Sequence, residues 1–288
     1  YRPAMFVSIG AYAKPENRTR ALTLVRLAIN LGFAAGPALG GLIIMSIGYQ
    51  GLFWVDGLSC IVAILIFWLK VKEKKKSAFT DKEHPGEILT HSVFKDKPFW
   101  LFLFTCLVSG ILFFQVFTTI PLYHREQFNL SELQTGLLLT MNGLLVFFCE
   151  MAIVSYVERK KINKVKVVAF GCLLMAISMF LMLMNTWVGI LTIMMLFMTF
   201  AEMFAFPFSN SVALSRAPKG HEGRYMAIYT MSFSLAHILS AKVGMEIIEY
   251  YKTDGYQMNW LFMGTLGVLG TICGFWVYQL IQAENKPL

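Results

Sequence analysis

Charged residues are scarce in this sequence. Lys, Arg, Asp and Glu together make up 15% of the 288 residues, whereas hydrophobic residues make up 57% and the mean hydropathy is +0.60. A soluble domain normally carries about 25% charged residues. The composition therefore excludes an ordinary water-soluble globule and predicts a protein whose main solvent is lipid.

The sequence also lacks the patterns that carry enzyme chemistry or hold metal ions. Its five cysteines lie inside apolar runs without a C-x-x-C spacing, and its five histidines are scattered. It contains no phosphate-binding glycine loop, no G-x-S-x-G and no H-E-x-x-H. We therefore expect no disulfide framework, no metal site, no cofactor and no enzymatic activity.

Long apolar runs, by contrast, are abundant. A helix needs about 20 residues to cross the hydrocarbon core at 1.5 Å per residue. We predict an all-α, polytopic membrane protein with eight complete spans, at 21–47, 51–70, 98–122, 133–157, 165–184, 187–213, 225–250 and 257–281. Residues 1–13 are apolar but too short to cross, and the chain opens on Tyr1 rather than Met. We expect them to be the end of a ninth helix in an N-terminally truncated chain.

Positive charge is concentrated in alternate connections between the spans. Of the 25 Lys and Arg residues, 19 lie in segments 14–20, 70–97, 159–166 and 216–224. The positive-inside rule places these segments in the cytoplasm, and so predicts a multi-pass protein of the cytoplasmic membrane. A nucleic-acid-binding surface would gather basic and aromatic residues on one folded face. We therefore expect no nucleic-acid partner and assign the charge to topology and to contacts with the lipid bilayer.

Two apolar segments 204 residues apart repeat each other. Residues 20–44 align with residues 224–248, and Gly40 meets Gly244 in this alignment. Both copies follow a proline-bearing apolar segment and a basic loop. Duplicated bundles of this kind form the two halves of many secondary transporters.

One polar linker divides the predicted spans. We expect residues 1–70 to form the C-terminal part of a first transmembrane bundle, residues 71–97 a cytoplasmic linker, and residues 98–288 a second bundle of six helices. The other connections are short, so adjacent spans should run antiparallel.

The first span carries the sharpest motif, G-x-x-x-G-P-x-x-G-G, formed by Gly32, Gly36, Pro37, Gly40 and Gly41. Small residues let a neighbouring helix approach closely, and the proline is expected to bend the helix. This pattern resembles the fifth helix of the proton-coupled drug antiporters of the major facilitator superfamily. The resemblance implies a partial major facilitator fold, from the end of helix four through helix twelve.

The same resemblance implies a proton-coupled secondary transporter that moves a small molecule by alternating access. It favours efflux of a drug or another amphipathic compound. The segment around Glu202 is similar to helix ten of proton-coupled oligopeptide transporters, which leaves symport of a nutrient or peptide open. A membrane receptor or scaffold that does not transport is a third alternative. We expect a small-molecule substrate and protons as partners, and a functional monomer.

Ionisable residues inside the spans are the candidates for proton coupling, because a charge at the bilayer centre costs at least ~2.5 kcal/mol unless it faces water or a partner. These candidates are Glu202, Glu150 and His237. Each has a structural alternative. Glu202 could pair with a basic residue outside the chain, Glu150 could anchor the Arg159 loop, and His237 could be a packing residue; for Glu150 and His237 we prefer the structural interpretation. Arg26 could meet Glu150, although we prefer snorkelling to the membrane surface.

Polar and aromatic residues on three spans are candidates for lining a substrate cavity. Amides and hydroxyls can bond a ligand or a neighbouring helix equally well, so helix packing is the alternative for each. These candidates are Gln115, Thr119, Asn142, Phe206 and Asn210.

Overall fold

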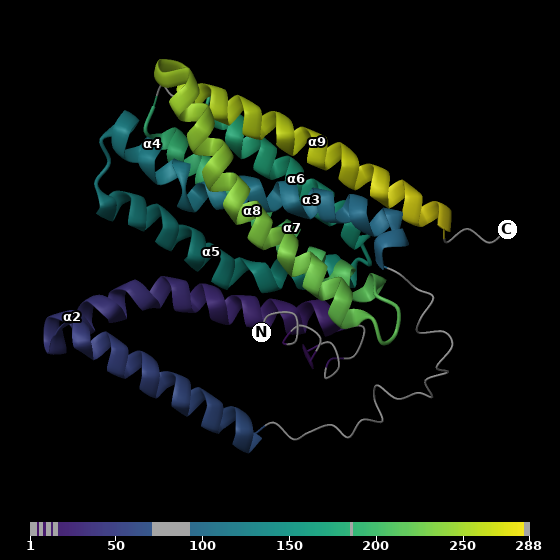
Figure 1. The fold of residues 1–288 in the computed structure, drawn as a ribbon, viewed down its shortest axis with the longest axis horizontal. Helices are drawn as coiled ribbons and strands as arrows, with labels where there is room; N and C mark the ends of the chain where they lie inside the picture. The colour runs from purple at the N-terminus through teal and green to yellow at the C-terminus, as the bar shows by residue number, and fades with distance from the viewer. Residues whose placement is uncertain are drawn as a thin grey trace.

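The computed structural model describes residues 17–70, 93–184 and 187–284, together with Met5, Ser8, Ile9 and Ala13. The described ranges are almost entirely helical and contain no β-strand, which confirms the all-α prediction (Figure 1). The α-helices are α2 (Arg18–Lys70), α3 (Lys97–Phe114), α4 (Thr119–Phe128), α5 (Glu132–Arg159), α6 (Lys164–Leu181), α7 (Gly189–Arg216), α8 (Glu222–Tyr251) and α9 (Gly255–Glu284). Short 3₁₀ turns, η3 (Val93–Lys95), η4 (Gln115–Phe117) and η5 (Lys252–Asp254), adjoin them.

Polar side chains fix where several helices begin. The Asp96 carboxylate accepts the backbone N–H of Phe99 at 3.1 Å, with a proline in the first turn of α3. Ser131 and Gln134 form a capping box at the start of α5. The Asn163 side chain accepts two backbone N–H groups at the start of α6. These caps satisfy helix ends at the polar boundary of the apolar spans.

The predicted spans fall on helices, with two departures. The first two spans follow each other within α2 without a loop; the backbone stays helical through Pro37 and breaks at Gly48, with φ 74° and ψ −179°. A glycine can adopt this positive φ without steric strain, and the helix reverses direction there (Figure 1). The predicted span 98–122 is interrupted by η4, after which α4 continues it.

The glycine-rich motif lies in the first half of α2. A Cβ atom added to Gly32 would meet nothing within 4 Å, so no helix in the described part of the chain approaches this position closely. The described helices therefore do not supply the close approach predicted for Gly32, which stays a prediction. The side chains of Gly36, Pro37, Gly40 and Gly41 fall outside the described residues.

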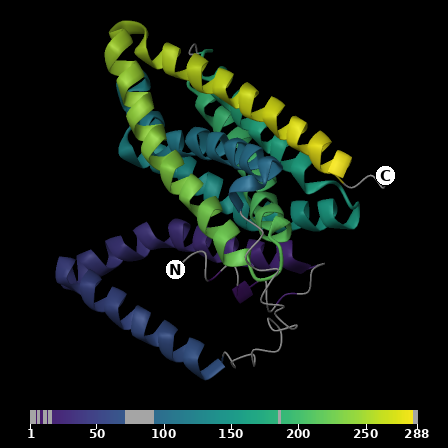
Figure 2. The same ribbon diagram turned by 45° about the vertical axis from the view of Figure 1, so that its right-hand side comes forward.

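Helices α3 and α5–α9 pack on one another, with α6 against α7 and α9, and α3 against α8 and α9. Some of these contacts are close because they involve glycine: a Cβ on Gly171 of α6 would lie 2.7 Å from the backbone N of Ala205 and 2.8 Å from the backbone O of Ala201, both on α7. Helix α2 packs on α5 and α7, and it lies on the opposite side of the bundle from α9 in both views (Figures 1 and 2).

The predicted basic segments meet at one end of the bundle. We call this the basic end, and it contains Arg18, Lys97, Arg159 and Arg216 at helix termini. There one face of the first turns of α2 is buried, with Thr19 and Thr23 at 0% exposure, whereas Leu24 in the same turns is 58% exposed. This buried face lies where α2 packs on α5 and α7. Most of the predicted linker, residues 71–92, falls outside the described residues.

Six helical stretches of the described residues are long and apolar enough to cross a membrane. The last of them, Glu222–Glu284, comprises α8 and α9, which run antiparallel to each other (Figure 1). This agrees with the predicted multi-pass arrangement.

Candidate proton-coupling site

A single arginine joins α2 to carboxylates on two other helices. Arg26 lies eight residues into α2, about 12 Å from its start at 1.5 Å per residue. Its Nη2 lies 2.5 Å from Glu202 Oε2 on α7, and its Nε lies 3.3 Å from Glu150 Oε1 on α5. The three side chains are 14%, 2% and 0% exposed, respectively. One guanidinium is therefore shared by two buried carboxyl groups.

Glu202 is held by several donors. Its Oε1 accepts from Asn142 Nδ2 at 2.5 Å, and its backbone carbonyl accepts from Arg26 Nη1 at 3.3 Å. The same Asn142 nitrogen donates to Thr199 Oγ1 at 2.9 Å. Both oxygens of the Glu202 carboxylate thus have a polar partner, which fixes the side chain between α2, α5 and α7.

Glu150 is held more loosely. Its Oε1 is within ion-pair distance of Arg26 Nε, but the geometry is not that of a hydrogen bond, and neither Glu150 oxygen has a hydrogen-bond partner among the described residues. A buried carboxylate without donors is poorly stabilised in its charged form. If both carboxyl groups are ionised, the group formed by Arg26, Glu150 and Glu202 carries a net charge of −1.

An aromatic ring covers the arginine. The Arg26 guanidinium lies 4.9 Å from the centroid of the Phe206 ring, within the range of a cation–π interaction. Phe206 and Asn210 follow Glu202 at intervals of four residues and so share one face of α7. Asn210 donates to the Phe206 carbonyl at 3.0 Å, while its Oδ1 is buried and lacks a partner in the described ranges. This face of α7 is therefore both aromatic and polar.

Two candidates for the cavity lie in a different cluster. Gln115 donates to the backbone and side-chain oxygens of Ser240, both at 2.9 Å, and accepts from Asn259 at 3.2 Å and from Thr119. All four residues are 0% exposed. This cluster joins η4, α4, α8 and α9 where the helical span is interrupted. For Gln115 and Thr119 these contacts fit the alternative of helix packing.

His237 also lies apart from Glu150 and Glu202. It is exposed, and its ring packs against Phe114 with centroids 4.6 Å apart. The structure thus brings together Arg26, Asn142, Glu150, Glu202 and Phe206, and separates His237 from them.

Two of the preferred interpretations from the sequence are wrong. Arg26 does not snorkel to the surface, because its guanidinium turns inward to both carboxylates. Glu150 does not anchor the Arg159 loop, because its ion-pair partner is Arg26. The basic partner of Glu202 likewise lies within this chain.

Sequence reasoning missed a polar cluster nearer the basic end. Lys164 Nζ donates to Thr19 Oγ1 at 2.7 Å and to Ser211 Oγ at 2.8 Å, and Thr19 donates to Ser211 at 2.9 Å. Beside this cluster, Arg20 Nε lies 2.9 Å from Glu158 Oε2. These contacts tie α2 to α5, α6 and α7. Two hydroxyl groups and one amino group on three separate helices give no periodic signal in the sequence.

A second missed cluster closes the basic end of α3, α7, α8 and α9. Arg216 Nε and Nη2 donate to the Asp96 carboxylate at 3.0 and 2.9 Å, the Tyr225 hydroxyl donates to it at 2.9 Å, and Arg216 Nη1 lies 2.6 Å from Glu284. Burial acts to raise the pKa of Asp96, but hydrogen bonds from Arg216, Tyr225 and the Phe99 N–H outweigh it and hold this pKa below its ordinary value. An Asp directly before Lys-Pro at a helix start was the available signal for Asp96.

Comparison with known proteins identifies the family of this chain. Residues 1–241 match the family model described as Major Facilitator Superfamily. The chain belongs to the major facilitator superfamily. Members of this superfamily are transporters rather than enzymes, which agrees with the absence of enzyme motifs.

Curated relatives and a solved structure of the superfamily resemble the chain along most of its length. It is 22% identical over 311 residues to a "Na(+), Li(+), K(+)/H(+) antiporter" of Planococcus maritimus, covering 99% of this chain and 72% of the relative. It is 23% identical to the uncharacterized MFS-type transporter YttB of Bacillus subtilis (strain 168), covering 94% of this chain and 67% of the relative. The crystal structure of the human organic anion transporter MFSD10 (TETRAN) matches 92% of this chain with a TM-score of 0.72 at 17% identity, which supports the fold. The chain spans 66% of that solved chain.

Proposed function

We propose that this major facilitator chain belongs to a proton-coupled antiporter that exchanges protons for a positively charged small molecule by alternating access. The observation that carries the proposal is the single Arg26 guanidinium shared by Glu150 and Glu202. With both carboxylates ionised the group carries one net negative charge, and with one of them protonated it is neutral. A proton and a monovalent cation therefore compete for the same net negative charge of this group. Such competition is the requirement for exchanging one for the other.

Glu150 is the proposed proton-binding carboxyl. Glu202 accepts from Arg26 and from Asn142, so protonation would disrupt hydrogen bonds that stabilise its charged form. Glu150 has no such donors within the described residues and is 0% exposed. We therefore assign Glu202 the role of a fixed counter-ion for Arg26.

Two kinds of cargo fit this proposal. An amphipathic organic cation is favoured by the aromatic rings beside the site, where Phe206 packs edge-on against Phe113 with centroids 4.9 Å apart. An alkali cation is the second candidate, since carboxylate, amide and hydroxyl oxygens of Glu150, Asn142 and Thr199 are suitable hard ligands and one relative is described as a sodium, lithium and potassium antiporter. The net negative charge argues against symport of an anionic nutrient.

The proposal retains the domain bounds, membrane orientation and monomeric state that the sequence predicts. Residues 1–70 would belong to the first bundle and residues 98–288 to the second, joined by the linker 71–97. The basic end would face the cytoplasm of a cell whose cytoplasmic membrane holds the protein. Because α2, α5 and α7 of one chain form the carboxyl site, a monomer would suffice.

Reconstitution of the full chain in proteoliposomes tests the proposal. With an imposed pH gradient, release of protons on adding a fluorescent lipophilic cation supports drug-type antiport, and release on adding sodium or potassium supports alkali cation antiport. Inward movement of a peptide with protons would favour the symport alternative. No flux under any gradient would favour a receptor or scaffold and would contradict the proposal.

A further inference from the structure

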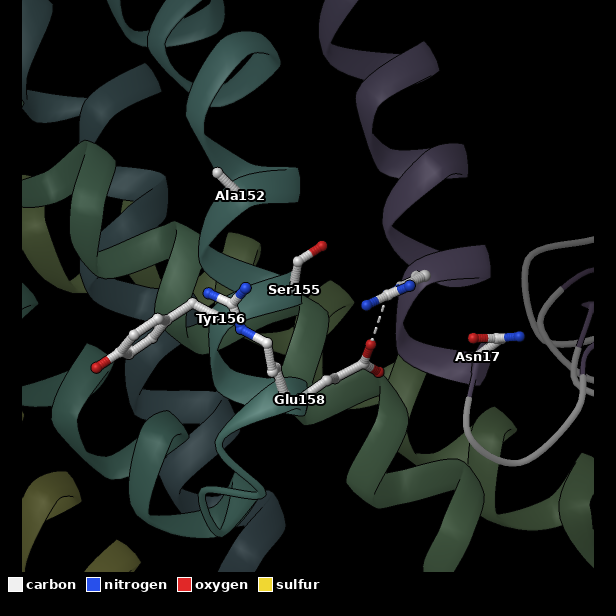
Figure 3. A pocket seen from close by; sticks show the side chains of 7 residues that line it. Asn17, Ala152, Ser155, Tyr156 and Glu158 are labelled. Atoms are coloured by element: carbon white, nitrogen blue, oxygen red, sulfur yellow. Dashed lines mark ion pairs between the residues drawn. The ribbon is translucent and has the colours of Figure 1, made fainter.

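A pocket lies at the basic end between α2 and α5, closer to the surface than the carboxyl site. Its volume is about 440 Å³. Figure 3 shows Ser155 and Glu158 extending from α5 toward α2, with Asn17 just before the start of α2. The remaining lining residues are Arg20 on α2 and Ala152, Tyr156 and Arg159 on α5.

The residues of α5 that line the pocket lie along one face of that helix. Ala152, Ser155, Tyr156 and Arg159 follow one another at i, i+3, i+4 and i+7, which places them along one stripe of the helix. The stripe changes from small and apolar to basic as it approaches the end of α5. A molecule bound along it would have a charged end at the membrane surface and an apolar end deeper in the membrane.

The pocket carries excess positive charge. Its lining residues include two guanidinium groups and one carboxylate, so the net charge is +1. Glu158 meets Arg20 through Nε at 2.9 Å, which leaves the terminal amino groups of Arg20 available in the described structure. Arg159 forms no ion pair with any residue that the structure describes. Guanidinium groups bind phosphate through paired N–H donors.

The neighbouring residues suit a lipid better than a free ion. The Tyr156 side chain is 51% exposed at the basic end, where aromatic rings sit at the level of lipid headgroups. Ala152 lies one turn deeper and leaves room for an acyl chain. Basic pockets between helices on the cytoplasmic side are typical sites for anionic headgroups.

We infer that this pocket binds the phosphate of an anionic lipid headgroup between Arg20 and Arg159. Asn17 and Ser155 supply neutral hydrogen-bond donors on either side. Since Arg20 belongs to α2 and Arg159 to α5, the bound headgroup connects these two helices and stabilises their contact at the basic end.

Nanodiscs containing the full chain test this inference. The bound lipid is measured by native mass spectrometry, and the melting temperature is measured in phosphatidylcholine with and without phosphatidylglycerol. We expect phosphatidylglycerol to be retained and to raise the melting temperature. Arg159→Gln should weaken its retention roughly fivefold, since a basic residue near an anionic surface contributes about that factor. Arg125→Gln, at the opposite end on α4, is the matched control and should change neither value.

Arg20→Gln provides a second variant on the facing helix and is expected to act in the same direction. Melting in phosphatidylcholine alone shows which variants fold. Wild-type retention of phosphatidylglycerol by a folded variant of either arginine would overturn the inference. Displacement of the lipid by millimolar inorganic phosphate would also overturn it, because the site would then bind a free anion.

Discussion

Arg26 Nη2 and Glu202 Oε2 lie 2.5 Å apart, although the two residues are separated by 176 positions in the sequence. Their pairing joins α2 to α7 through a buried ionic contact. The Glu150 carboxyl lies 3.3 Å from the same guanidinium, so one cation is shared by two buried carboxyl groups.

Replacing Arg26 by Gln should destabilise the protein. The change leaves two buried carboxyl groups without their cation, and removal of one partner of a buried ion pair costs about 3–5 kcal/mol. The measurement is the melting temperature in detergent at pH 7. Adding Glu202→Gln to Arg26→Gln should recover part of the loss, and equal melting temperatures for Arg26→Gln and the wild type would contradict the ion-pair arrangement.

Asp96→Asn should lower the stability of the folded protein at neutral pH. Hydrogen bonds to a charged group contribute roughly 1.5–3 kcal/mol, and Asn cannot accept from Arg216 and Tyr225 as the carboxylate does. Because the pKa of Asp96 is lowered in the folded state, its stabilisation is complete above its ordinary value of 3.8 and is lost as the pH falls through the folded-state pKa. Melting curves of wild type and variant should therefore differ at pH 7 and converge in strong acid. A constant difference at all pH values would count against this assignment.

Lys164→Met should loosen the contact between α2 and α7 at the basic end. It removes two hydrogen bonds from a charged donor, and loss of about 1.4 kcal/mol corresponds to a tenfold change in an equilibrium. The readout is the rate at which a water-soluble thiol reagent labels a cysteine at the buried position Thr23, after replacement of the five native cysteines. Labelling should accelerate roughly tenfold. Lys166→Met serves as the control, and no difference between the two lysine variants would contradict the role of Lys164.

Gly171→Ala should destabilise the contact of α6 with α7. The added methyl group would lie 2.7 Å from the backbone N of Ala205, which cannot move as a flexible side chain could. Overpacking of this kind typically costs about 1–3 kcal/mol. Gly136→Ala adds the same group where nothing lies within 4 Å, so its melting temperature should be unchanged or raised. A tolerated Gly171→Ala would show that the two helices are less closely packed than described.

The fold was largely predictable from the sequence, and the reasons are local. Apolar length locates the helices, and residues such as Ser131 and Asn163 signal where helices begin. The interruption at η4 was missed although it has a local signal, since Pro121 has no backbone N–H and its ring would clash with the Phe117 carbonyl in an uninterrupted helix. Hydrogen bonds of Gln115 with Ser240 and Asn259 then hold this turn against α8 and α9.

The candidate site was only partly predictable. The rarity of charges inside spans identified Glu150, Glu202 and Arg26 as unusual, but it could not say which helices face one another. Snorkelling is possible for an arginine near the end of a single helix, whereas the structure places Arg26 against α5 and α7. Thr199 was missed because a threonine in an apolar helix carries no signal until Asn142 is placed beside it.

Proton flux driven by a cargo gradient in proteoliposomes, compared among wild type, Glu150→Gln, Glu202→Gln and Glu246→Gln, tests the central claim most directly. Glu246 is exposed and lies 3.9 Å from Lys242 on the surface, so its replacement should leave the flux unchanged. Glu150→Gln fixes the site in its neutral form and Glu202→Gln removes the counter-ion of Arg26, so both should reduce proton flux to the level of protein-free liposomes while the proteins remain folded. Undiminished cargo-driven proton flux in folded Glu150→Gln and Glu202→Gln would contradict the account.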